Sequence, residues 1–230
     1  MAETVVITGA NRGIGLGLAR VLTSRGSEVV ALVRRPETAS ELAEIARRTG
    51  RVRILNCDVV APDALGAAAA EIARPVDLLI CNAGQFQARG GIDDPDHTVA
   101  AWSQTLMTNV AGVFFTVRAF LPWLAAAKPA RVAVISSLMG ATARAPGGAY
   151  IYRASKAAAT NLARNLATDL AERGISVGAY HPGWVRTEMG GTAAPVSVEE
   201  SAAGLVARFD ALSLATTGAV EDFEGTPLPY

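Results

Sequence analysis

The stretch TVVITGANRGIG, residues 4–15, decides the fold. It begins as a β-branched apolar run, which is typical of a buried strand, and that run stops at Gly9. Apolar residues then recur at helical spacing from Leu16 to Arg25, and Gly26 follows as a natural helix stop. The stretch therefore predicts a strand, a glycine loop and a helix in immediate succession.

The three glycines of this loop have separate physical uses. Gly9 permits a tight turn, Gly13 lets the backbone approach a pyrophosphate, and Gly15 lets the helix pack close to the sheet. The helix that follows offers unpaired N–H groups to phosphates at its N-terminus. Glycine in a strand-to-helix turn can also serve conformation alone. The position after a first strand favours a dinucleotide site, because that is the context the motif requires.

Strand-like and helical segments alternate along the whole chain. The expected strands cover residues 4–8, 28–33, 52–57, 76–81, 131–135, 175–180 and 219–220. The expected helices cover residues 16–25, 37–48, 62–73, about 96–123, 152–172 and 197–209. The strand-like runs are apolar on both faces, as parallel strands covered on both sides are. We expect one α/β domain over residues 1–230, a Rossmann-type doubly wound parallel sheet of about seven strands with helices on both faces.

Composition argues against several classes of partner. The 21 basic and 21 acidic residues balance, so no basic excess indicates nucleic acid. No apolar run approaches the roughly 18 residues that span a bilayer, and no leader pattern precedes the first strand, so we expect a cytoplasmic protein without a membrane partner. Cys57 and Cys81 are expected to be buried free thiols. His97 and His181 lack metal-ligand spacing, so no metal is expected.

The end of the second strand bears on the choice of nicotinamide cofactor. NAD sites usually place an acidic residue about 20 residues after the glycine loop. Here the chain has Arg34 and Arg35 and no acid before Glu37. Guanidinium groups at Arg34, and at Arg12 in the loop, suit a 2′-phosphate. These arginines could also be ordinary solvated loop residues, but the pattern favours NADPH/NADP+ over NADH.

A phenol and an ammonium share one helical face further along the chain. Tyr152 and Lys156 are four residues apart, and Ser137 closes the strand just upstream. A nearby ammonium should lower the pKa of the tyrosine, which could then exchange a proton with an alkoxide or alcohol. Such pairs are common on ordinary helices, and Ser137 could be only a cap. The carboxyl edge of a parallel sheet, however, is where open α/β folds bind ligands.

Taken together, these motifs resemble the short-chain dehydrogenase/reductase family from end to end. The resemblance implies that Asn109 holds a water of a proton relay, Ser137 orients the substrate, Tyr152 is the acid/base and Lys156 its partner. An asparagine within a helix could instead only distort it locally. With the arginines above, the residues expected to bind the cofactor are Gly9, Asn11, Arg12, Gly13, Ile14, Gly15, Arg34, Asp58, Val59, Asn82, Ala83, Gly84, Tyr152, Lys156, Pro182, Gly183, Val185 and Thr187.

Some positions depart from the family pattern. Cys81 replaces the first asparagine of the N-N-A-G element, and the spacing from Ser137 to Tyr152 is two residues longer than usual. Tyr150 would restore that spacing, but it lies six residues from Lys156, on the wrong helical face. We therefore keep Tyr152 and assign the extra residues to the loop 142–148. The chain looks most like the small NADPH-dependent carbonyl reductases of the C-factor-like group. The features that carry this resemblance are this loop, the YRASK motif and the tail Leu228-Pro229-Tyr230.

The resemblance implies hydride transfer between NADPH and a small carbonyl or alcohol: a ketone, aldehyde or quinone in the reductive direction. Family members commonly form homodimers or homotetramers, and we expect one of these. Apolar side chains on segments expected to border the pocket indicate an apolar or aromatic substrate, although each could equally be core. Two alternatives stay open: a non-catalytic NADP-binding regulatory or signalling protein, and a biosynthetic dehydrogenase of a sterol, sugar or polyketide alcohol. The apolar side chains are Phe86, Met139, Trp184 and Met189.

Overall fold

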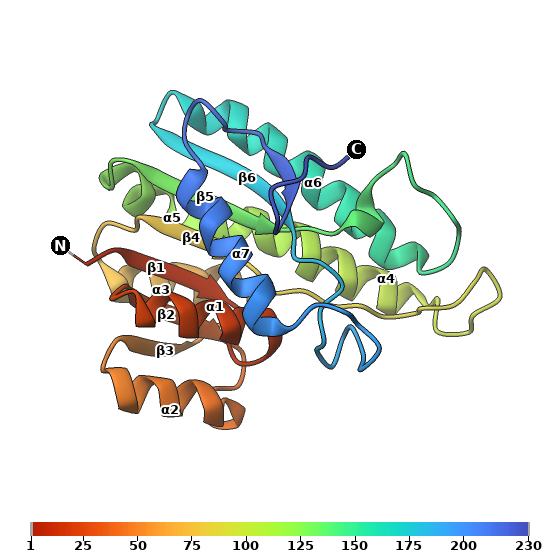
Figure 1. Cartoon of the computed structure of the whole chain (residues 1–230), viewed down its shortest axis with the longest axis horizontal. Coiled ribbons are helices and arrows are strands. Elements are labelled where there is room, and N and C mark those ends of the chain that lie inside the picture. Colours follow the sequence, from red (N-terminus) through yellow and green to blue (C-terminus); the bar gives the residue numbers. More distant parts are fainter. Residues whose placement is uncertain (1, 230) are drawn as a thin grey trace.

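The seven strands form one parallel sheet in the computed structural model, which describes residues 2–229. Their order is β3-β2-β1-β4-β5-β6-β7. The chain runs outward from β1 to β3, returns to β4 on the other side of β1, and continues outward to β7, so the strand order reverses between β1 and β4. In Figure 1 the strands point from the N-terminal side toward the long loops. The fold class is confirmed. The strands are β1 (Thr4–Thr8), β2 (Glu28–Val33), β3 (Val52–Asn56), β4 (Leu78–Cys81), β5 (Ala130–Ile135), β6 (Ile175–His181) and β7 (Val220–Asp222).

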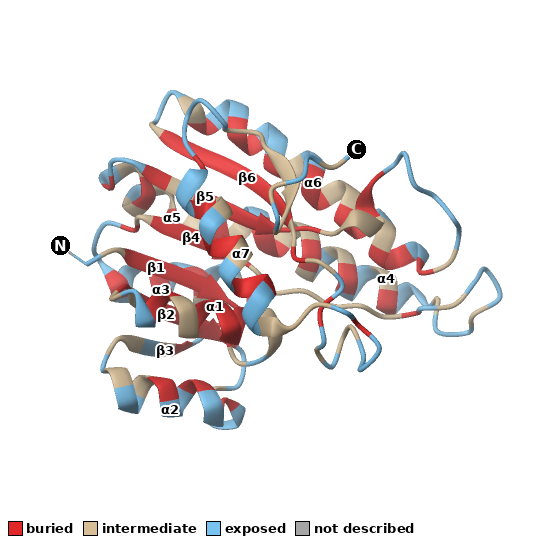
Figure 2. Ribbon diagram, in the orientation of Figure 1, coloured by how far each residue is buried: buried red, intermediate tan, exposed pale blue. Residues whose placement is uncertain are grey.

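Helices cover both faces of the sheet, as the doubly apolar strands require. On β1, Val6 packs with α3, α5 and α6, whereas Val5 and Ile7 pack with α1, α2 and α7. Successive side chains of a strand point to opposite faces, so one strand feeds both cores. Figure 2 shows the central strands buried between the helices. The helices are α1 (Gly13–Ser24), α2 (Ser40–Thr49), α3 (Pro62–Ile72), α4 (Val99–Leu106), α5 (Gly112–Ala126), α6 (Tyr150–Ala171) and α7 (Val198–Ala211), with short 3₁₀ turns η1 (Pro36–Thr38) and η3 (Leu138–Gly140).

Two helices differ from their predicted bounds in ways that matter for the site. α1 begins at Gly13, inside the glycine loop, rather than at Leu16. The long helix expected over about 96–123 is interrupted by a π-helical turn, η2 (Met107–Ala111), which contains Asn109. Such turns are rare in proteins, and those that occur often lie at functional sites.

The stretch Val99–Ala126 corrects the expectation that no run is apolar enough for a membrane. It has 28 residues, and the mean hydropathy over an 18-residue window within it is 1.3. By length and composition alone, such a helix could cross a bilayer. In the fold, Val117, Phe120 and Leu124 are buried against the sheet. A core helix of an α/β domain passes the same test, and this one covers a face of the sheet.

The two cysteines are free and buried, as expected. Burial raises the pKa of the Cys57 thiol to about 11 and that of the Cys81 thiol to about 12. Both thiols are therefore protonated at neutral pH and act as small apolar side chains. Cys81, at the position where the family motif has asparagine, packs within the sheet core.

Candidate active site

The predicted site residues gather at one edge, where the strands end. Parallel strands place all their carboxyl ends on the same side of the sheet, so motifs far apart in sequence meet there. These positions are Gly9 after β1, Arg34 after β2, Asp58 after β3, Asn82 to Gly84 after β4, Ser137 after β5, and Pro182 and Gly183 after β6.

The glycine loop fits tightly against the end of β4. Gly9 has φ +67°, and a Cβ there would lie 3.0 Å from the Ala83 Cα. A Cβ at Gly15 would lie 2.4 Å from the Gly9 carbonyl oxygen and 2.6 Å from the Asn82 Nδ2. Real Cβ contacts are not this short, so glycine is required here to bring α1 close to the sheet.

Asn82 ties the end of β4 to the end of β1. Its Nδ2 donates hydrogen bonds of 3.0 Å to the carbonyl oxygens of Thr8 and Gly9. In return, the Thr8 Oγ1 accepts from the backbone N–H groups of Asn82 and Ala83, also at 3.0 Å. These four bonds hold the glycine loop at the point where the strand order reverses. Asn82, Ala83 and Gly9 thus lie together, as the motifs predicted.

The glycine loop suits the pyrophosphate of a dinucleotide. Among residues 2–229, no side chain caps the N-terminus of α1, whose N-cap residue is Arg12. The first-turn N–H groups and the positive end of the helix dipole are therefore available to an anion. Across the loop, a Cβ at Gly13 would lie 3.3 Å from the Thr187 Cγ2, and Arg12 pairs with Glu188. The loop after β6 thus lies over the glycine loop, where a cofactor would be enclosed.

The ends of β2 and β3 are more open. Arg34 is exposed, and its carbonyl oxygen accepts a hydrogen bond from the Asn56 side chain. The Asp58 carboxylate accepts from the Val60 N–H at 3.1 Å and so stabilises its own turn. Val59 is buried beside Gly112, whose Cβ would lie 2.8 Å from it. Asp58 and Arg34 lie at the edge expected for the adenosine half, and their contacts to a cofactor stay predictions.

The predicted catalytic pair lies on the buried face of α6. Tyr152 is only 8% exposed, and its phenol lies near enough to the Ser137 hydroxyl for that hydroxyl to act on the phenol pKa. The Lys156 Nζ donates to the Ile135 carbonyl oxygen at 2.7 Å and lies 5.6 Å from the centroid of the Tyr152 ring. Tyr150, by contrast, is 38% exposed and packs edge-on against His97. The structure thus brings Ser137, Tyr152 and Lys156 together and leaves Tyr150 outside.

Asn109 reaches the same site from the π-helical turn. Its Oδ1 accepts from the Gln85 N–H at 2.8 Å, and its Nδ2 donates to the Gln85 carbonyl at 2.9 Å and to the Ser155 Oγ at 2.9 Å. A Cβ at Gly84 would lie 3.4 Å from the Asn109 Oδ1 and 3.7 Å from the Lys156 Nζ. The amide therefore fixes the segment after β4 beside the lysine. A water-holding role for Asn109 stays a prediction.

Burial has the largest effect on the pKa values of Tyr152 and Lys156. It raises the pKa of Tyr152 to about 12, while the Ser137 hydroxyl and the charge of Arg89 act in the lowering direction. Burial also lowers the pKa of Lys156 to about 8. The expectation of a lowered tyrosine pKa was therefore wrong for this structure, because the cost of burying a phenolate exceeds the effect of nearby charge. At neutral pH, Tyr152 is a protonated phenol and can act as a proton donor.

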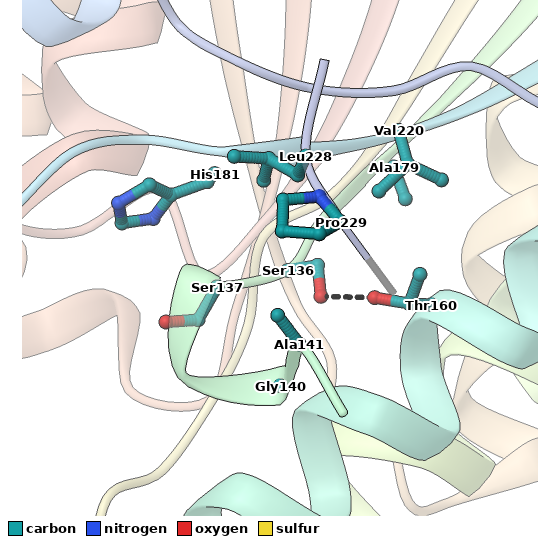
Figure 3. A pocket seen from close by; sticks show the side chains of 10 residues that line it. All are labelled: Ser136, Ser137, Gly140, Ala141, Thr160, Ala179, His181, Val220, Leu228 and Pro229. Atoms are coloured by element: carbon teal, nitrogen blue, oxygen red, sulfur yellow. Dashed lines mark hydrogen bonds between the residues drawn. The ribbon is translucent and has the colours of Figure 1, made fainter. Parts of the chain in front are cut away.

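A small recess lies behind Ser137, and the C-terminal tail forms one of its walls (Figure 3). Ser136 and Thr160 share a 2.6 Å hydrogen bond at its base. Leu228 and Pro229 cover it from the other side, since the tail folds back and the Leu228 N–H donates to the Val220 carbonyl at 2.9 Å. The sequence did not predict this packing of the tail; Tyr230 lies outside the described residues.

Comparison with known proteins identifies the family. A family model described as short chain dehydrogenase matches residues 3–196. The chain belongs to this family. C-signal of Myxococcus xanthus is 38% identical over 157 residues, which cover 68% of this chain and 93% of C-signal.

Solved structures place this short-chain dehydrogenase beside carbonyl reductases. The NADPH-bound carbonyl reductase from chicken fatty liver is 34% identical, with a TM-score of 0.91, and the match covers 100% of this chain and 99% of that one. A carbonyl reductase from Pseudomonas aeruginosa PAO1 in complex with NADP is 36% identical, with a TM-score of 0.88 over 100% of both chains. The resemblance to a carbonyl-reductase-like group is therefore confirmed.

Proposed function

We propose that this short-chain dehydrogenase uses NADPH to reduce a small carbonyl compound, a ketone, aldehyde or quinone, to the alcohol, and that the same site supports the reverse reaction. The observation that carries the proposal is the buried Tyr152. Its phenol lies near the Ser137 hydroxyl, adjoins Lys156, and is protonated at neutral pH. A preformed proton donor at the ligand-binding edge is what carbonyl reduction requires.

Each side chain has a distinct role in this reaction. NADPH supplies a hydride to the carbonyl carbon when bound. The hydroxyls of Ser137 and Tyr152 donate hydrogen bonds to the carbonyl oxygen and so stabilise the negative charge that develops there. Tyr152 then transfers its proton to that oxygen. The Lys156 ammonium, close to the phenol ring, stabilises the phenolate that remains.

The preference for NADPH rests chiefly on the exposed Arg34, because Arg12 already pairs with Glu188, and the NADPH- and NADP-bound relatives support it. Arg34→Glu is expected to lower the ratio of kcat/KM with NADPH to that with NADH by about 10- to 100-fold, since a carboxylate repels the 2′-phosphate. Steady-state kinetics with both cofactors measure this ratio. Arg35→Glu makes the same charge change at the next exposed position. An equal loss in both variants would contradict a specific contact at Arg34.

The pH dependence should follow Lys156. Because burial lowers its pKa to about 8, the ammonium is present below that pH and is lost as pH rises through it. Tyr152 keeps its proton over the same range, since its pKa is raised to about 12. We therefore expect kcat/KM for reduction to fall as pH rises above about 8. Lys156→Arg keeps its charge, so any activity it retains should lack this fall; a wild-type profile flat to about pH 10 would contradict the assignment.

The function itself is tested by NADPH oxidation with a panel of aldehydes, ketones and quinones. The proposal predicts turnover that depends on the carbonyl and is faster with NADPH than with NADH. If the protein binds NADPH but oxidises it with none of these, carbonyl reduction is refuted and a non-catalytic regulatory role is favoured. Faster oxidation of sterol, sugar or polyketide alcohols would favour the biosynthetic alternative. A cytoplasmic homodimer or homotetramer stays a prediction.

A further inference from the structure

The ring of Tyr152 is stacked on a second aromatic ring. Phe86, two residues beyond the Asn82-Ala83-Gly84 element, lies parallel to it, with 4.2 Å between centroids and 18° between planes. Stacking of aromatic rings stabilises a defined ring position beyond simple burial. The proposed proton donor is thus held by Phe86 on one face.

A cation covers the Phe86 ring. The Arg89 guanidinium carbon lies 4.5 Å from the ring centroid. Because the Tyr152 ring covers one face of Phe86, a guanidinium at this distance over the ring occupies the other face. The positive charge stabilises the stack as a cation–π contact. Arg89 also acts on Tyr152 through its charge.

Arg89 bonds to the loop after β6 as well. Its Nη2 donates to the Met189 carbonyl oxygen at 2.9 Å. Met189 belongs to the segment 183–191, which includes Thr187 beside the glycine loop. One side chain therefore contacts both the ring that supports Tyr152 and the loop that lies over the cofactor edge.

The backbone around Arg89 is built to hold it in this place. At one end of the segment, Gln85 exchanges hydrogen bonds with Asn109, and at the other the Gly90 carbonyl accepts from the Ala149 N–H at 3.0 Å. Between them, buried Ala88 has φ +48°, a left-handed conformation that costs free energy in any residue with a Cβ. A strained turn fixed at both ends persists where a side chain must be aimed.

We propose that Arg89 is a positioning residue of this site, which holds Phe86 against Tyr152 and holds the segment 183–191 over the cofactor edge. This role rests on the proposed function for its effect on turnover. Arg89 touches neither reacting atoms nor substrate in this scheme: it acts on kcat through Phe86, and it holds the segment 183–191 through Met189. Its effect on kcat should therefore depend on the presence of the Phe86 ring.

A double-mutant cycle, measured with the fastest carbonyl of the panel, tests whether Arg89 holds Phe86 against Tyr152. Arg89→Met is expected to lower kcat by about three- to tenfold, as loss of a cation–π contact and a charged hydrogen bond would. Arg89→Lys should recover most of it. Phe86→Leu should also lower kcat, and adding Arg89→Met to it should cost little more, because the two residues act in series. Losses that multiply would overturn the proposed action through Phe86.

Hydrogen exchange of the protein alone tests whether Arg89 holds the segment 183–191, and it needs no turnover. Amides of segment 183–191 should exchange faster in Arg89→Met than in the wild type, because the Met189 carbonyl loses its partner. Arg74→Met removes the same charge in the α3–β4 loop, at the opposite edge of the sheet, and should change neither exchange nor kcat. Wild-type exchange in Arg89→Met would overturn the loop-holding role. Absence of carbonyl turnover in the wild type would refute the proposed function, while the exchange result still decides the role of Arg89.

Discussion

Tyr152→Phe is expected to lower kcat for carbonyl reduction by about 10²–10⁴-fold, the range typical for loss of a general acid. The substitution removes one oxygen and keeps the ring, so the stack on Phe86 persists. NADPH affinity and the melting temperature should change little by comparison. Steady-state kinetics, cofactor titration and thermal unfolding measure the three quantities.

Tyr150→Phe is the matched control, because it makes the same chemical change two residues earlier on the same helix. Tyr150 is exposed and packs edge-on against His97, so kcat should stay within about twofold of the wild type. This pair of variants also decides the spacing question raised by the sequence. A large loss in Tyr150→Phe with near-normal Tyr152→Phe would contradict the assignment of the acid.

Gly15→Ala is expected to have the largest effect on cofactor binding among changes of a single methyl group. Its Cβ would meet the Gly9 carbonyl oxygen and the Asn82 Nδ2, so α1 must move away from the sheet. We expect a loss of about 1–3 kcal/mol in the free energy of unfolding, as overpacking typically causes, and a rise of at least about tenfold in the Kd for NADPH. Denaturant unfolding and fluorescence titration measure these effects.

Gly66→Ala controls for the substitution itself. Gly66 lies in α3, and within the described residues nothing lies within 4 Å of the position of its Cβ. Alanine should therefore stabilise this helix by about 0.5–1 kcal/mol and leave NADPH binding unchanged. Equal behaviour of the two variants would show that the contact at Gly15 has no special role.

The fold could be predicted from the sequence because its signals are local and repeat. Doubly apolar runs such as Val5 to Ile7, alternating with helical segments, are typical of a parallel sheet covered on both faces. Helix ends were less predictable, since α1 begins within the glycine loop. The π-helical turn at Asn109 has no signal in the sequence, and the hydrogen bonds of the Asn109 side chain go to Gln85 in a distant segment.

The residues of the candidate site could be predicted from the sequence, but their pKa values and packing could not. Spacing alone favoured Tyr152 over Tyr150, and the structure places Tyr152 against Ser137. The direction of the tyrosine pKa shift was not predictable, because it depends on how deeply the phenol is buried. Phe86 was recognised as a pocket candidate, but its stacking on Tyr152 and the position of Arg89 depend on a turn strained at Ala88. Sequence patterns carry no signal for such a turn.

The most direct test of the account is to follow the hydride itself. NADPH carrying deuterium at the transferable C4 position is incubated with the fastest carbonyl of the panel, and the alcohol is analysed by mass spectrometry. Carbonyl reduction at this site predicts an alcohol with one deuterium on the former carbonyl carbon. The wild type should form it, and Tyr152→Phe should form it about 10²-fold or more slowly. Alcohol without the label, or label formed equally fast by Tyr152→Phe, would contradict NADPH-dependent carbonyl reduction by this site.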